Sequence, residues 1–269
     1  MKISTTHKLL SIHAFCHLML IPAFMYGELW MFILGFMWWQ FIAASAISAG
    51  YHRYFSHRSF EAPNWYRYYV QILGMLANPG PVLTWASTHR MHHAYTDTKE
   101  DPHSPKFDKN PLAMMWRTKN IYQDINKKRI IIAEKFTKNV PQWEVFDNFA
   151  SSIFSRIAWG GAYVLFFYFF ADAWWQWLFL PIVFLMAPIH GMIINWFAHV
   201  YGYVNFKVND TSKNLFPFDF LMMGEGYHNN HHKHGSRANF GGVRWHEIDI
   251  TYSIMCVLDK LKIIKIKNK

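Results

Sequence analysis

We predict an all-α integral membrane protein in which four transmembrane helices carry a helical cap on their cytosolic side. Apolar residues make up 52% of the 269 residues and aromatic residues 19%, which is high for a soluble domain of this size. Lys and Arg are absent between Lys8 and Arg53 and again between Arg156 and Lys207, gaps of 44 and 50 residues. The apolar residues are therefore concentrated in two long stretches.

Each stretch is long enough for two membrane spans joined by a tight turn, since one span needs about 20 apolar residues. The turns are expected near Tyr26–Gly27–Glu28 and Ala171–Asp172–Ala173. Four buried helices of a large soluble core are the alternative, which the length of the cation-free stretches disfavours. We expect one domain, 1–269, with spans at 8–25, 29–50, 153–171 and 174–198 and a cap formed by 51–152 and 199–269.

The charges predict the orientation in the membrane. All 27 Lys and Arg lie at 1–8, 53–156 and 207–269, which places both termini and the cap in the cytoplasm by the positive-inside rule. Within the cap, 64–77 is expected to be a helix lying along the membrane surface. The tail 258–269 alternates Lys with Ile and Leu, and it is either bound to anionic lipid or a solvated end.

Composition also limits the partners and cofactors. The formal charge of +10 suits anionic lipid or an acidic partner protein, and no nucleic-acid-binding motif accompanies it, so no nucleic acid is expected. The two cysteines, Cys16 and Cys256, are too few for an iron–sulfur cluster or a cysteine-ligated zinc site.

Histidines are numerous, sixteen in all, and many occur in short motifs. On a helix, the positions i, i+3 and i+4 of an HxxHH motif share one face, so three imidazoles can converge. Structural zinc takes four ligands, so nine candidates indicate two metal ions, and neutral imidazole suits Fe, Zn, Cu and Ni. The candidates follow the predicted spans or lie in the cap: His52 and His57 (HRYFSH), His89, His92 and His93 (HRMHH), His199 (NWFAH), and His228, His231 and His232 (HNNHH).

The other histidines have structural interpretations. We expect His13 and His17, in the first span, to be polar packing residues, and His190 to be buried and hydrogen-bonded. The others are expected to surround the site or lie at the surface: His103, His234 and His246.

Three segments resemble the membrane fatty acid desaturase family of the stearoyl-CoA and acyl-lipid Δ9 type. They are GYHRYFSHRSF (50–60), HRMHH followed by DPHSP (101–105), and GEGYHNNHH (224–232), within a match from about Gly50 to Tyr252. The resemblance implies that the nine histidines bind two irons, that Asn195 holds a metal-bound water, and that O2 is the co-substrate for inserting a cis double bond, at Δ9, into a saturated acyl chain. It also implies four transmembrane helices with a cytosolic cap.

The chemistry is consistent with this resemblance, because removing hydrogen from an unactivated methylene requires a redox cofactor. Carboxylates such as Glu225 and Asp101 are expected to accept imidazole N–H bonds. A histidine-box hydroxylase or alkane monooxygenase, using the same ligands, is the main alternative. A metal transporter would instead place ionisable residues at mid-membrane depth.

Substrate and electron donor are less defined. Ser87 and Thr88 stand where the vertebrate acyl-CoA enzymes carry an Arg–Asp pair, so the acyl carrier stays open among CoA, acyl carrier protein and lipid. No fused cytochrome b5 motif is present, which implies a separate donor such as a ferredoxin, a rubredoxin or a cytochrome b5-type protein.

The sequence AASAISAG at 43–50 consists almost entirely of small residues. Small residues allow close packing between membrane helices, but they are also compatible with an acyl tunnel. In the family, the positions matching Gln40 and Ala44 lie near the tunnel end, and the position of Trp85 lines its bend.

Overall fold

The computed structural model describes residues 42–77 and 79–268. The expected helix 8–25, most of 29–50, His13, His17 and Gln40 lie outside the described residues. Helices dominate the described part of the chain. In chain order the elements are η1 (Ala46–Ser56), β1 (Phe60–Glu61), α4 (Asn64–Gly74), α5 (Val82–Tyr95), η2 (Pro105–Phe107), α6 (Pro111–Asn126), α7 (Glu134–Thr137), α8 (Glu144–Ser151), α9 (Ile153–Phe170), η3 (Trp174–Phe179), α10 (Leu180–Phe184), α11 (Met186–Met192), η4 (Ile193–Phe197), α12 (Ala198–Val200), α13 (His228–Lys233), α14 (Ile250–Lys260) and β2 (Lys265–Ile266).

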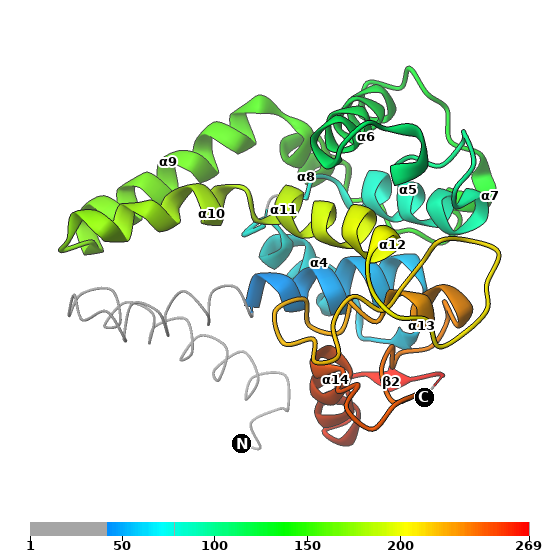
Figure 1. The fold of residues 1–269 in the computed structure, drawn as a ribbon. Coiled ribbons are helices and arrows are strands. Elements are labelled where there is room, and N and C mark those ends of the chain that lie inside the picture. Colours follow the sequence, from blue (N-terminus) through cyan, green and yellow to red (C-terminus); the bar gives the residue numbers. More distant parts are fainter. Residues whose placement is uncertain (1–41, 78, 269) are drawn as a thin grey trace.

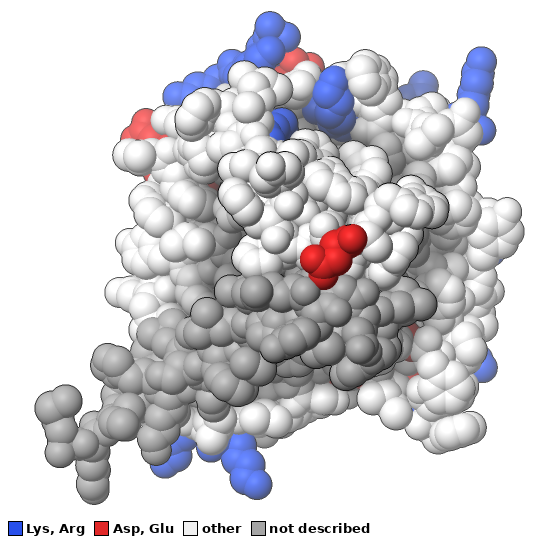
Figure 2. All heavy atoms as spheres, turned by 90° about the vertical axis from the view of Figure 1, so that its left-hand side faces the viewer, with Lys and Arg blue, Asp and Glu red and all other residues white. Residues whose placement is uncertain are grey.

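Helix α9 is long and apolar enough to cross a membrane. Its 18 residues have a mean hydropathy of 1.4, and only 11% of them are buried within the protein. It extends with α10 away from the other helices (Figure 1). The face at this end is almost uncharged, with Lys and Arg at its margins and a single acidic group near its centre (Figure 2). The helix matches the expected 153–171 to within one residue.

The expected helix 174–198 is broken. Trp174–Phe184 and Met186–Val200 meet at an angle of 62°, so they are a bent pair and not one straight span. Pro188 explains the position of the break, because a proline ring clashes with the carbonyl four residues earlier, here that of Phe184, and donates no hydrogen bond to it.

The cap is built around η1, which packs against α4 and α5. A Cβ on Gly74 would lie 2.6 Å from the Tyr51 ring, and one on Gly50 would lie 2.8 Å from the Val70 side chain. Both glycines therefore permit a close approach between η1 and α4. Since Ala43 is fully buried as well, part of the small-residue segment serves close packing.

Two cap predictions need correction. Helix α4 ends at Gly74, not at 77, and it buries Tyr66 and Val70 against the core. The C-terminal tail is not a solvated end: β2 pairs antiparallel with β1, and Ile264 and Ile266 are buried. The Lys/Ile alternation has the period of two that a half-buried strand requires.

Candidate metal centre

The nine histidines proposed as ligands converge in the structure. Their ligand atoms form two groups, and within each group these atoms lie within 4.8 Å of one another. We call them the five-histidine site and the four-histidine site. The first comprises His52, His57, His89, His93 and His231, and the second comprises His92, His199, His228 and His232.

Each HxxHH motif serves both sites, which corrects the expectation that its three imidazoles converge on one volume. In HRMHH, His89 and His93 belong to the five-histidine site and His92 to the four-histidine site. In HNNHH the assignment is the opposite: His231 belongs to the five-histidine site, and His228 and His232 belong to the four-histidine site. At about 100° per residue around the helix axis, the side chains at i and i+4 point in directions about 40° apart. The side chain at i+3 is rotated about 60° from i in the opposite sense. One turn of helix therefore faces two metals.

The HxxxxH motif depends on a different backbone. Segment η1 is a π-helix, and the His57 N–H donates to the His52 carbonyl at 3.1 Å. Residues i and i+5 would be about 140° apart on an α-helix, but the i→i+5 hydrogen bonds of a π-helix stack them. Both imidazoles therefore reach the five-histidine site.

Within each site the Nε2 atoms face one another at short range. The Nε2–Nε2 distance is 2.7 Å between His57 and His89, 2.8 Å between His93 and His231, and 3.1 Å between His199 and His228. Two nitrogens that both present lone pairs repel each other at such distances, and a shared cation removes the repulsion.

The outer nitrogens of three rings indicate that the inner ones carry lone pairs. An ionised carboxylate only accepts hydrogen bonds, so a ring nitrogen facing it carries the proton and leaves the other nitrogen free to bind a metal. These Nδ1 contacts are His52 with Glu225 (2.5 Å), His92 with Asp101 (2.9 Å) and His232 with Asp210 (3.0 Å). The Nδ1 atom of His199 faces the Thr211 hydroxyl at 3.1 Å, a group that can donate or accept.

The sequence indicated two of these four partners. Glu225 and Asp101 lie beside histidine motifs and accept N–H bonds as expected. Asp210 and Thr211 lie in the long loop between α12 and α13, more than ten residues from any ligand in the sequence, and no motif singles them out. Only the path of this loop brings them to the four-histidine site.

A buried ionic network holds Glu225. Arg53 is fully buried and donates to Glu225 at 2.6 Å, to Asp249 at 2.7 Å and to the Ala238 carbonyl at 2.9 Å. Burial raises the pKa of Glu225, but His52 and Arg53 together outweigh it and lower that pKa to about 2. Glu225 therefore stays ionised and links the arginine to a metal-facing imidazole.

Burial keeps six of the imidazoles neutral, which is the form that binds metal. Desolvation is the largest cause of the lowered pKa in each case, and neighbouring imidazoles lower it further. The residues whose pKa lies well below the usual 6.5 are His57, His89, His93, His228, His231 and His232.

His103 lies against the metal centre and not at the surface. Its side chain is buried, its ring centroid lies 4.5 Å from that of His92, and it forms a third group with His92 and Asp101. Burial lowers its pKa to about 3. Its ring nitrogens have no hydrogen-bond partner among the described residues.

A cavity of about 1120 Å³ reaches the metal centre. His52, His89 and His228 line it, as do Ala44 and Trp85. The Trp85 ring stacks on His89, with centroids 5.2 Å apart and planes 19° apart. The cavity thus exposes ligands of both sites to one shared volume.

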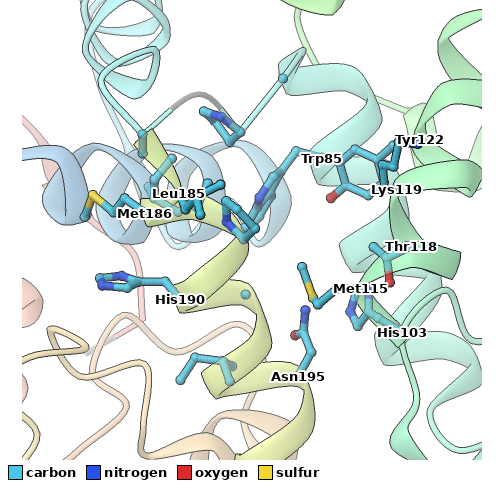
Figure 3. A pocket seen from close by; sticks show the side chains of 18 of the residues that line it. Trp85, His103, Met115, Thr118, Lys119, Tyr122, Leu185, Met186, His190 and Asn195 are labelled. Carbon is cyan, nitrogen blue, oxygen red and sulfur yellow. The ribbon is translucent and has the colours of Figure 1, made fainter. Parts of the chain in front are cut away.

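Asn195 lies in η4 and also lines the cavity. Figure 3 shows it beside Met115, with His103 on the same side of the view and His190 on the other. His190 in α11 was expected to be buried and hydrogen-bonded; it is only partly buried and lines the cavity.

The donor set fits two metal ions. Five and four imidazole nitrogens surround two separate points, with carboxylates held behind the rings and not aimed at the metals. All-nitrogen coordination suits Fe, Zn, Cu and Ni, and it excludes Mg and Ca, which require oxygen ligands.

Comparisons with known proteins agree with this centre. The chain matches the family model for fatty acid desaturases over residues 18–255, which contain all three histidine motifs. It is 32% identical over 260 residues to the sn-1 stearoyl-lipid 9-desaturase of Synechocystis sp., covering 95% of this chain and 76% of that protein. It is 31% identical to Delta-9 acyl-lipid desaturase 1 of Arabidopsis thaliana, covering 81% of this chain and 69% of that protein.

We expect His57→Ala and His199→Ala each to lower the metal content by about half, because each removes a ligand from only one of the two sites. Elemental analysis of purified protein measures the metals per chain. His234→Ala is the matched control, since this histidine belongs to neither site. Full metal content in both ligand variants would contradict the two-site assignment.

Proposed function

Because the chain belongs to the fatty acid desaturase family and is therefore an acyl desaturase, an oxidoreductase, we propose that it inserts a cis double bond at Δ9 of a saturated acyl chain, with O2 as co-substrate. The observation that carries the proposal is the cavity that contacts ligands of both metal sites and continues to Ala44. An extended acyl chain is a ligand of suitable shape for such a volume, and the relatives named as 9-desaturases support the position of the double bond.

We propose two irons as the metals. When bound, they supply the redox chemistry that removes hydrogen from an unactivated methylene, which side chains alone do not provide. The five-histidine site and the four-histidine site each hold one, and Asn195 positions a water. The cavity wall orients the acyl chain and excludes solvent, with Trp85 stacked on His89 as part of that wall.

We further propose that both termini and the cap lie in the cytoplasm and that four helices span the bilayer. Lys and Arg at the margins of the uncharged face in Figure 2 support this orientation. A cysteine at Asp172 should then react with an impermeant reagent added to intact cells, whereas one at Asn120 should not. Labelling at 120 alone would reverse the orientation.

Re-reduction of the metals requires a separate electron donor of the ferredoxin, rubredoxin or cytochrome b5 type. The excess of cations in the cap suits an acidic partner. Turnover limited by such a donor should slow as salt rises, because charge steering is screened over about 10 Å at 0.1 M salt.

Product analysis tests the reaction itself. The chain is expressed in a desaturase-deficient host, and the new fatty acids are identified by gas chromatography with location of the double bond. We expect monounsaturated Δ9 acids, and none from His92→Ala as an inactive control. Hydroxy acids in place of alkenes would favour a hydroxylase, and the absence of both would contradict the proposal.

The tunnel interpretation of Ala44 has its own test. Ala44 is buried and lines the cavity, so Ala44→Leu should shorten the available volume and shift preference toward shorter acyl chains while metal content stays normal. Ala43→Leu is the matched control: Ala43 is fully buried beside it but does not line the cavity.

The product profiles of the two variants against C14, C16 and C18 chains separate the interpretations. A packing role predicts that both substitutions lower activity equally for every chain length. An unchanged length preference in metal-loaded Ala44→Leu would contradict the tunnel assignment.

A further inference from the structure

One wall of the cavity carries positive charge. Helix α6 contributes Leu112, Trp116, Lys119 and Gln123 to the lining, and Lys127, the residue directly after the helix, lines it too. Their spacing of three or four residues places them along one face of the helix. Figure 3 shows Lys119 with Tyr122 and Thr118 on this side of the cavity.

The corner between α8 and α9 lines the same cavity with Ser151, Ser152 and Arg156. The Nη1 atom of Arg156 donates to the Ser151 carbonyl at 3.0 Å and to the Ser152 carbonyl at 2.7 Å. These bonds fix the guanidinium at the first turn of α9. A guanidinium has five N–H groups in a rigid fork, so donors are left for a ligand.

The positive charge on this wall has no counterion among residues 42–77 and 79–268. Among the described lining residues the one carboxylate is Glu225, which is already bound to Arg53 and His52. The Lys119 ammonium lies 3.9 Å from the centre of the Trp116 ring. No ion pair involves Lys119, Lys127 or Arg156 in the described part of the chain. An anionic group is therefore the ligand this wall favours.

Exposed apolar side chains surround the cations. The exposed fractions are 73% for Leu112, 64% for Trp116, 80% for Val145 and 71% for Ile153. Ile153 is also the first residue of the membrane-crossing helix α9. Apolar groups beside Lys, Arg and Trp at the end of a span are typical of the level of the lipid headgroups. This end of the cavity therefore opens at the membrane interface.

We propose that Lys119, Lys127 and Arg156 bind the phosphate of a membrane phospholipid whose acyl chain enters the cavity. This inference rests on the proposed desaturase function. A glycolipid with a neutral sugar headgroup would leave the three cations without a counterion. Acyl-CoA carries phosphate too, but it is a soluble carrier, whereas this end of the cavity opens at the level of the lipid headgroups, where a phospholipid resides. Ser87 is fully buried in α5 and adds no charge that a CoA group requires.

Binding to the purified full-length protein in detergent tests the proposal. The probes are stearoyl phosphatidylglycerol, a stearoyl galactolipid, stearoyl-CoA and stearoyl-acyl carrier protein. We expect the wild type to prefer phosphatidylglycerol. The variant K119Q/K127Q/R156Q should bind it roughly tenfold or more weakly, because charge-assisted hydrogen bonds are lost. Binding of the galactolipid should change little.

The matched control is K99Q/K109Q/K260Q, which removes equal charge from exposed lysines that do not line the cavity. Its affinity for phosphatidylglycerol should equal that of the wild type, and both variants should keep their metal content. The proposal is overturned if the two triple variants lose affinity alike, or if the wild type prefers the galactolipid, stearoyl-CoA or the acyl carrier protein.

The same variants in the desaturase-deficient host separate this inference from the proposed function. Loss of unsaturated product in K119Q/K127Q/R156Q alone, with weakened phospholipid binding, supports both. Tight, charge-dependent phospholipid binding by a wild type that forms no alkene would leave the phosphate site standing and reject desaturation.

Discussion

The rest of the structure depends on holding nine imidazoles with their Nε2 atoms about 3 Å apart in the protein interior. Lone pairs at that distance repel, and the buried rings have little room to move apart. Cations between the rings convert repulsion into binding, so metal binding and folding of this region are coupled. The carboxylates behind the rings fix which nitrogen carries the proton, and they would themselves be costly to bury without partners.

The charged network around η1 follows from that requirement. Glu225 is ionised because Arg53 and His52 both bind it, and Arg53 is balanced in turn by Asp249. Removing one partner from a buried ion pair costs about 3–5 kcal/mol, because the other charge is left uncompensated. The GEG sequence before the third histidine motif serves the same packing: the Gly226 N–H donates to Asp219 at 2.6 Å, and a Cβ on Gly226 would lie 2.8 Å from that carboxylate.

The sequence was sufficient for the identity of the convergent histidines and for α9, because both depend on local chemistry and on a long apolar run. It was not sufficient for the division of each HxxHH motif between two sites, since side-chain spacing alone does not show where the partner rings lie. The π-helix that aligns His52 with His57 depends on packing against α4 and α5. Asp210 depends on the path of a loop. Pro188 was visible as a break signal, but hydropathy alone joined the two halves of the bent pair.

The cavity joins these features into one geometry. Its lining includes Lys119 and Arg156 at the charged wall, ligands of both metal sites, and Ala44 within the small-residue segment. If the headgroup is held at the charged wall, the metals meet a methylene counted from the carboxyl end of the acyl chain. The volume near Ala44 then limits the length of chain beyond the reacting carbons without changing which carbons react. A fixed double-bond position and a variable chain length are thus set by two different parts of the same cavity.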